Sequence, residues 1–277
     1  MDERRYLVGG VLLVVVLAGG WYVWQWSRHS APVVAQPPAA QPAPAAPPPA
    51  APPPAPEAKV AHPLDAPAAS AGPTKPEVAL TALFGRRTVL TMFQLTDFPH
   101  RLVATIDNLG RATATARLWP LVPVSGRFSV QSEGGIELIS AANEQRYAPY
   151  VRLLESVDLK SAVATYVLLY PQLQKAYADL GFPEQYFNDR LIGVIDLLLT
   201  TPDAATPPKV HLPTLADATQ PAPRERPWVA YEFDDPALQA LAAGQRILLR
   251  MGADNERRVK SRLRELRQQL LAAELRH

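Results

Sequence analysis

The sequence from Asp158 to Leu199, DLKSAVATYVLLYPQLQKAYADLGFPEQYFNDRLIGVIDLLL, decides the fold. Its apolar residues recur at spacings of three and four, which is the pattern of an amphipathic helix. Asp158 is a favourable amino-terminal cap for a first helix, and Gly181 is a favourable end for it. Pro183 suits the first turn of a second helix. The apolar stripe of this second helix comprises Phe187, Leu191, Val194 and Leu198.

Helical spacing continues on both sides of this stretch. Asp235 is a favourable cap, Pro236 suits a first turn, and Gly252 suits the end of the same helix. We expect further helices at 78–95 (one or two short ones, broken near Gly85), 96–110, 147–157, 235–252 and 255–276.

The period changes between Arg111 and Ser140. Two β-prone runs, 128–131 and 136–139, flank the residues SEGG, which predicts a hairpin. The residues KVHL at 209–212 and WVAYEF at 228–233 predict a second small β element. Because an isolated hairpin is marginal in water, these strands must pack on the helices. The fold class is therefore mainly α (α+β), a helical domain with one or two small β-hairpins.

Residues 7–26, LVGGVLLVVVLAGGWYVWQW, contain no charge. At about 1.5 Å per residue, a helix of this length spans roughly 30 Å, the thickness of a bilayer core. Arg4 and Arg5 precede the run, which favours an amino end in the cytoplasm. We therefore predict a cytoplasmic segment 1–6 and a transmembrane helix 7–26 that contacts the lipid bilayer.

The alternative is a cleaved signal peptide. Val16, Ala18 and Gly20 form a small-residue pattern of the kind that signal peptidases cut. Cleavage there would leave a soluble periplasmic protein that begins with the residues WYVWQW. Both alternatives place the rest of the chain on the same side of the membrane.

Residues 27–76 are dominated by Pro and Ala. Proline fixes φ and removes a backbone donor, so neither helix nor sheet propagates. This composition also offers little apolar area to offset chain entropy. The segment is therefore predicted to be a disordered, proline-rich linker of polyproline-II type, which precedes a mainly helical domain at 77–277.

Three blocks of the domain carry a resemblance. They are Y-x-x-L-Y-P at Tyr166 to Pro171, YFNDRL at Tyr186 to Leu191, and G-Q-x-x-L-L-R-M-G at Gly244 to Gly252. With these blocks in this order, the chain resembles the bacterial domain-of-unknown-function family 3014 over most of Val78 to Leu270. The resemblance implies one amino-terminal membrane segment, a Pro/Ala-rich linker and this domain. It implies no activity, because the family is uncharacterised.

Asp189 and Asp196 lie on one face of the second helix. Two acids on an otherwise apolar helix are a candidate acid/base pair, which makes an envelope hydrolase one alternative function. The other interpretation is structural, because buried carboxylates need cationic partners and several arginines are available.

A dense set of polar residues opens the same helix, and two arginines of the predicted helix 235–252 can lie beside it. A pocket for a polar ligand and a network that ties two helices together both fit this pattern. The candidate ligand or interaction surface comprises Tyr186, Asn188, Asp189, Arg190, Arg246 and Arg250.

Composition excludes several classes of site. The net charge is +2, so no strong field recruits nucleic acid. The chain has no cysteine, which excludes disulfides and thiolate metal sites, and its histidines lack ligand spacing. No nucleophile elbow and no Gly-rich phosphate loop occur. We therefore predict no metal, no cofactor and no enzymatic activity.

The last predicted helix carries an excess of Lys and Arg. One interpretation is contact with anionic lipid or an acidic polymer, and the other is a solvated face whose Arg stems cover apolar surface. Taken together, the sequence predicts a single-pass, membrane-anchored binding or scaffold module on the periplasmic side of the bacterial inner membrane. Its partner would be an envelope protein or polymer.

Overall fold

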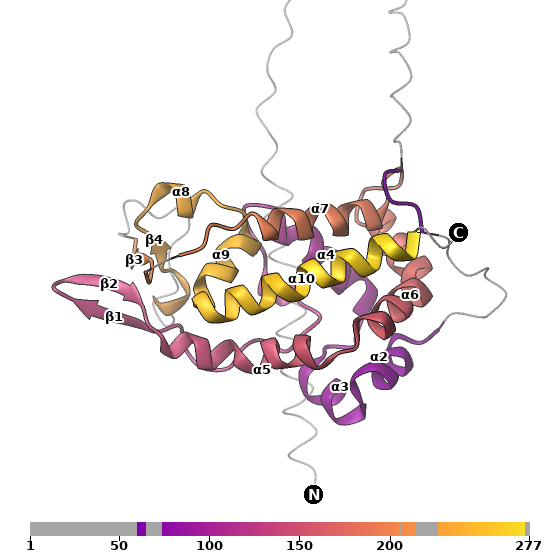
Figure 1. Cartoon of the computed structure of the whole chain (residues 1–277), viewed down its shortest axis with the longest axis horizontal. Coiled ribbons are helices and arrows are strands. Elements are labelled where there is room, and N and C mark those ends of the chain that lie inside the picture. Colours follow the sequence, from indigo (N-terminus) through magenta and orange to yellow (C-terminus); the bar gives the residue numbers. More distant parts are fainter. Residues whose placement is uncertain (1–59, 65–73, 205, 214–226, 275–277) are drawn as a thin grey trace, which may run out of the picture. The chain divides into compact units, whose positions relative to one another are not determined.

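A computed structural model describes residues 60–64, 74–204, 206–213 and 227–274 (Figure 1). The chain divides at Ala55, and all described residues belong to the unit Pro56–His277. The predicted transmembrane helix 7–26 and most of the predicted linker lie outside the described residues, so both stay predictions. Within the described ranges, no helix is both long and apolar enough to cross a membrane.

The described part of the domain is mainly helical, which confirms the predicted class (Figure 1). The break near Gly85 is also where it was expected. The α-helices are α2 (Pro76–Phe84), α3 (Arg86–Met92), α4 (Phe98–Leu109), α5 (Ala142–Ser156), α6 (Leu159–Asp179), α7 (Phe187–Leu199), α8 (Pro236–Gln239), α9 (Ala243–Arg250) and α10 (Ala253–Glu274), with short 3₁₀ turns at Ala116–Leu118 and Pro227–Val229.

Helix α6 begins as predicted, because the Asp158 carboxylate accepts the Ser161 amide at 2.9 Å. Helix α7 begins later than predicted, at Phe187 instead of near Pro183. The side chain of Gln174 explains the shift. Its Oε1 accepts the Phe187 amide at 2.8 Å, and its Nε2 donates to the Gln185 carbonyl at 2.8 Å. A residue of α6 therefore holds the turn in place of a local cap.

The prediction of one helix over 235–252 was wrong. Asp235 does cap a helix, accepting the Ala237 amide at 2.8 Å, but α8 ends at Gln239. The Gln239 side chain instead accepts the Phe233 amide at 3.1 Å, which draws the chain toward the sheet. A new helix, α9, then begins at Ala243, whose amide donates to the Arg111 carbonyl at 2.7 Å. The start of α9 is therefore held by the loop after α4 and not by α8.

The predicted β elements form one antiparallel sheet of order β1-β2-β3-β4. The strands are β1 (Val130–Glu133), β2 (Ile136–Ile139), β3 (Lys209–His211) and β4 (Glu232–Phe233). The elements merge because Leu138 of β2 pairs with Lys209 of β3. Strand β1 extends beyond the predicted end because the turn needs only Gly134 and Gly135, whose φ values are +58° and +82°.

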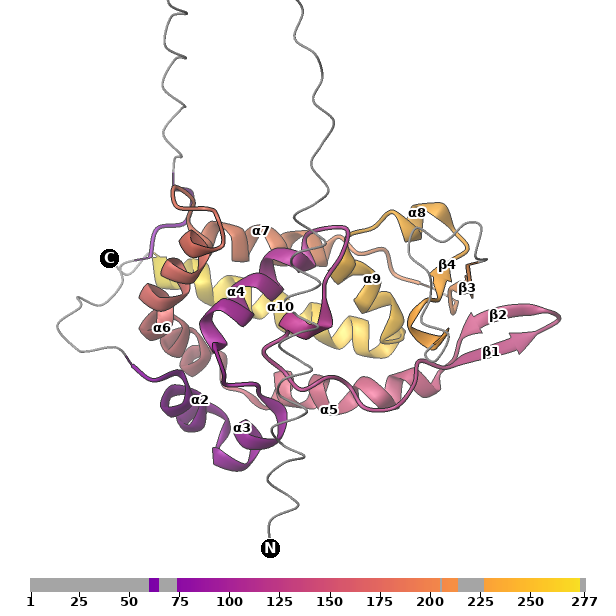
Figure 2. The ribbon, with the colours of Figure 1, turned by 180° about the vertical axis from the view of Figure 1, so that it is seen from behind.

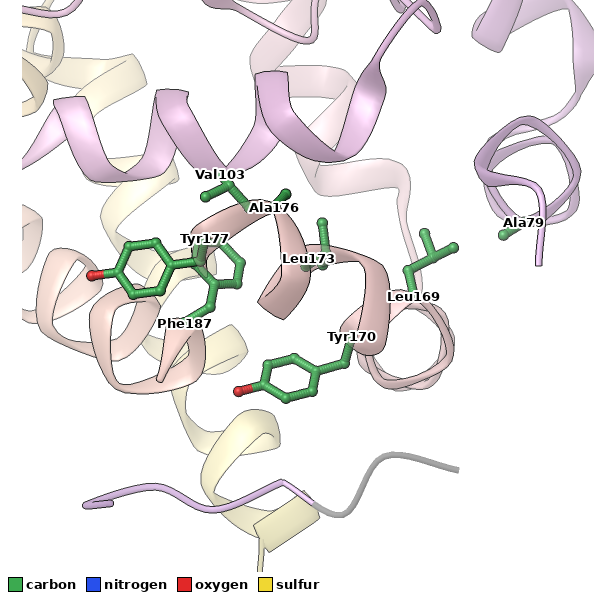
Figure 3. Close-up of a cluster of buried hydrophobic side chains, with 8 residues drawn as sticks. All are labelled: Ala79, Val103, Leu169, Tyr170, Leu173, Ala176, Tyr177 and Phe187. Atoms are coloured by element: carbon green, nitrogen blue, oxygen red, sulfur yellow. The ribbon is translucent and has the colours of Figure 1, made fainter. Parts of the chain in front are cut away.

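The core lies where α4 and α10 cover α6 and α7. Helix α4 packs on α6 and α7, and α10 packs against α5, α6 and α7 (Figure 2). One buried cluster centres on the aromatic rings of Tyr177 and Phe187, whose centroids are 5.6 Å apart (Figure 3). Helix α10 has an apolar seam, in which Leu263 and Leu270 pack against residues of α6 and α7.

Two glycines mark close approaches around α9. A Cβ on Gly244 would lie 2.9 Å from the Leu109 carbonyl oxygen and 2.6 Å from the Leu198 side chain. Gly252 has a φ of +87°, and a Cβ there would collide with the Glu144 side chain. These two positions therefore set how closely α9 approaches α4 and α7, and how the chain turns into α10.

Candidate functional site

The predicted polar residues at the start of α7 bind a distant segment of the same chain. Asn188 is fully buried, and its Nδ2 donates to the His62 carbonyl at 3.0 Å while its Oδ1 accepts the Tyr166 hydroxyl at 3.1 Å. The Asp189 carboxylate accepts the backbone amides of His62 at 2.8 Å and Ala61 at 3.1 Å. We call Tyr166, Asn188 and Asp189 the α7 cluster.

The segment that the α7 cluster holds comprises residues 60–64, Val-Ala-His-Pro-Leu, and is called the docked segment below. Its side chains alternate in burial: Val60, His62 and Leu64 are half-buried, while Ala61 and Pro63 are exposed. The backbone bends at Ala61 and His62, and the bend brings their two successive amides to one carboxylate. Leu64 packs against the buried cluster of α4, α6 and α7.

Arg190, the next predicted residue, ties α7 to α4. Its Nε donates to the Asp107 carboxylate at 2.9 Å, and its Nη2 donates to the Asp107 carbonyl at 2.7 Å. The same carboxylate, whose side chain is 5% exposed, also accepts Arg111 Nε at 2.6 Å. This hydrogen bond to Asp107 raises the pKa of the Arg111 guanidinium. Tyr186 occupies the cap position of α7 and is 41% exposed, without capping the helix through its side chain.

The other two predicted arginines hold backbone carbonyls outside the α7 cluster. Arg246 Nη2 donates to the Ala112 carbonyl, and Arg250 Nη2 donates to the Tyr231 carbonyl at 2.6 Å. The Arg250 guanidinium also lies 5.3 Å from the Phe233 ring centroid. Burial lowers the pKa of this guanidinium. The predicted six-residue surface thus divides into three parts, and it is Asn188 and Asp189 that hydrogen-bond to the docked segment.

The candidate acid/base pair of α7 is held by two different partners. Asp189 accepts the amides of the docked segment, whereas Asp196 accepts Arg267 Nε at 2.5 Å and Nη2 at 3.1 Å. Their shared helix face is real, but the two carboxylates are oriented by separate interactions.

A buried charge cluster at the start of α10 was missed. The Lys260 side chain is 4% exposed, and its Nζ contacts Glu256 Oε1 at 2.6 Å, the Thr201 carbonyl at 2.6 Å and Asp203 Oδ1 at 2.7 Å. Burial lowers the pKa of the Lys260 ammonium, but the hydrogen bonds to Asp203 and Glu256 outweigh burial, so this pKa lies above its usual value. A signal was present, since Glu256 lies one heptad before Leu263 of the apolar seam.

Acidic partners neutralise much of the basic face of α10. Arg258 donates to Glu155 at 2.5 Å, and Arg262 donates to Glu265 at 2.5 Å. Arg262 also donates to the Val157 carbonyl at 2.6 Å, which fastens the α5–α6 junction. The charge excess read from the sequence is thus mostly paired within the domain.

The domain has open pockets away from the α7 cluster. One of about 630 Å³ lies between the sheet, residues 202–208 and α8. Leu138, Leu238 and Leu249 give it apolar walls, and its carboxylates are Glu133, Asp203, Asp234 and Asp235. Another, of about 410 Å³, lies between the α5–α6 junction and α10, and its lining is mostly polar. In the part of the chain that is described, no group of His, Asp and Glu side chains is arranged to hold a metal ion.

Comparison with known proteins gives one match. Residues 98–267, from α4 into α10, match the family described as "Protein of unknown function (DUF3014)". No curated protein and no solved structure matches the chain.

Proposed function

The chain belongs to the DUF3014 family, and on that premise we propose that it is a binding or scaffold module anchored at the bacterial inner membrane. Residues 7–26 would form the anchor, residues 27–59 the main part of the tether, and the helical domain would face the periplasm. Its partner would be an envelope protein or polymer. The tether would act by confining the domain near that partner, which raises their effective concentration.

The observation that carries this proposal is how the chain enters the domain. The docked segment is the first described stretch of the chain and lies within the predicted linker, and Asn188 and Asp189 fasten its backbone to α7. Leu64 adds an apolar anchor. Because the end of the tether is bound to α7, the tether leaves the domain at a fixed position on its surface. A passive spacer would not need such a contact.

The pocket of about 630 Å³ supports binding over catalysis. Concave sites with apolar walls and a few polar groups are the usual form of ligand sites. The pocket has carboxylates at its edge, and two of them are already engaged: Asp234 pairs with His211 at 2.6 Å and Asp203 pairs with Lys260 at 2.7 Å. These contacts favour a fixed rim over groups that exchange protons with a substrate.

An envelope hydrolase that uses Asp189 and Asp196 draws less support. Each carboxylate is committed to a structural partner, the docked segment in one case and Arg267 in the other. Replacing both by Asn tests this alternative. Loss of a hydrolytic activity with an unchanged melting temperature would favour the enzyme, whereas a lower melting temperature favours the structural roles.

Membrane topology gives the direct test of the proposal. A periplasm-dependent phosphatase fused after His277 is expected to be active, and the full chain is expected to sediment with membranes. Deleting residues 7–26 should abolish both results. A silent phosphatase together with a fluorescent cytosolic fusion at the same position would overturn the proposal. Mass spectrometry of the mature amino terminus separates the anchor from a cleaved signal peptide.

A further inference from the structure

We propose that the start of α7 is a peptide-binding site, which the chain's own residues 60–64 fill in this structure and which also accepts the same sequence from solution. Its ligand class is a short peptide that carries Val-Ala-His-Pro-Leu and bends at its second and third residues. The inference goes beyond the tethering function and does not depend on the membrane anchor.

The site recognises a peptide main chain. Asp189 accepts two successive amides, from Ala61 and His62, and Asn188 donates to the His62 carbonyl. These contacts come from residues more than 120 positions away in the sequence, so they are not local turn geometry. The carboxylate accepts backbone amides and the Asn188 side chain donates to a backbone carbonyl, so the site binds both kinds of polar group of a peptide main chain.

Side chains of the docked segment add selectivity. Leu64 packs against the apolar cluster that includes Tyr170 and Phe187, and Val60 and His62 are half-buried. Pro63 lies exposed between two half-buried residues and has no amide that would need a partner. The segment therefore combines a backbone that is fixed by hydrogen bonds with one apolar anchor.

The site is held by the domain and not by the peptide. The Tyr166 hydroxyl orients the Asn188 amide, and Gln174 fixes the first turn of α7 by accepting the Phe187 amide. Asn188 is fully buried, so the domain fixes the amide group that donates to the peptide carbonyl.

The docked segment is separable from the domain core. Within the described residues, the contact is made by residues 60–64, and residues 65–73 connect them in sequence to Thr74, whose carbonyl accepts Gln172 Nε2 at 2.7 Å. Release of the docked segment therefore removes local contacts while the Thr74 contact with α6 can persist. Openings of this limited kind occur far more often than global unfolding.

The test measures binding of a fluorescent peptide with the sequence of residues 57–68 to variants of the full chain, by anisotropy. In the vacated variant, residues 60–64 are replaced by Gly-Ser-Gly-Ser-Gly. This variant is expected to bind the peptide saturably. The unmodified chain is expected to bind the peptide at least about tenfold more weakly, because its own segment competes at an effective concentration on the order of millimolar.

Two matched substitutions within the vacated variant locate the site. Asp189→Asn is expected to weaken binding about tenfold, since a charged acceptor of two amides is lost. Asp196→Asn, on the same helix, is expected to leave binding unchanged. If the vacated variant does not fold, Leu64→Ala in the full chain removes only the apolar anchor and should raise peptide binding relative to the unmodified chain.

Three results would overturn the inference. They are no saturable binding to a folded vacated variant, equal binding to the vacated and unmodified chains, and equal losses from Asp189→Asn and Asp196→Asn. Failure here leaves the membrane topology untouched, so it is distinguishable from failure of the proposed function.

Discussion

Replacing Lys260 by Met should destabilise the domain strongly, because it breaks the buried cluster at the start of α10. The ammonium group contacts Glu256 at 2.6 Å, the Thr201 carbonyl at 2.6 Å and Asp203 at 2.7 Å. Methionine fills the space of the aliphatic stem but supplies none of these contacts. Glu256, whose side chain is 2% exposed, would then be a buried carboxylate without a cation.

The expected cost follows from these exposures. Removing one partner of a buried ion pair costs about 3–5 kcal/mol. Asp203 contributes little, because its side chain is 84% exposed and water replaces the lost partner. For a domain of this size a loss of about 4 kcal/mol lowers the melting temperature by about 8–16 °C. Because the pKa of Lys260 is raised in the folded state, its contribution is complete below its ordinary value of 10.5 and is lost as the pH rises through the raised pKa.

The assay is urea unfolding followed by far-ultraviolet circular dichroism, as a double-mutant cycle. Lys260→Met combined with Glu256→Leu removes both buried charges and should recover stability to within about 1–3 kcal/mol of the unmodified chain, the remaining cost being the unpaired Thr201 carbonyl. Arg257→Met is the matched control on α10: its pair with Asp254 is exposed, so it should cost less than about 1 kcal/mol. The reasoning is refuted if Lys260→Met costs less than about 1 kcal/mol, or if the two substitutions show no coupling.

Three further predictions concern other contacts. Asp107→Asn should cost about 1–3 kcal/mol in urea unfolding, because a buried carboxylate loses its charge between two guanidinium groups; an unchanged midpoint would contradict this. The hydrogen bond to Asp97 is the main cause of the raised pKa of His100. The protonated His100 therefore stabilises the folded domain fully below pH 6.5, and this contribution is lost as the pH rises through the raised pKa. The melting temperature of His100→Gln should therefore fall below that of the unmodified chain at pH 5.5 and converge with it near pH 9, an effect of at most about 1 kcal/mol for this exposed pair. Gly252→Ala should cost more than about 1 kcal/mol, because the φ of +87° disfavours a side chain and Glu144 blocks the Cβ; a melting temperature equal to that of the unmodified chain would show that both can adapt.

The helices were predictable because each buries an apolar face whose spacing is local. The break near Gly85 was predictable too, but the start of α7 and the end of α8 were not, because side-chain amides that bond to residues outside their own helix decide them. Gln174 delays the start of α7 by binding the turn before it, and Gln239 ends α8 by bonding to the sheet. Neither residue differs, in sequence terms, from an ordinary helix residue. A local pattern thus predicts that a helix exists but not where a tertiary contact ends it.

Of the two parts of the candidate site, only the residues of α7 could be predicted from the sequence. Asn188 and Asp189 stood out as polar residues that open an apolar helix, and the structure places both in a recognition contact. Their partner lies in a Pro/Ala-rich stretch whose composition predicts no contact. The buried pair of Glu256 and Lys260 was hidden for another reason, since a strongly basic helix makes one more lysine look like surface.

Gly244 has a consequence for how relatives of this chain are recognised. The residue belongs to the block Gly244–Gly252, and the space beside it is filled by Leu109 and Leu198. The glycine of this block is thus required by helix packing, and a sequence search that relies on the block finds proteins with the same packing of helices. The walls of the pocket of about 630 Å³ come mostly from residues outside that block. We therefore expect proteins that share the block to share a scaffold while differing in what they bind.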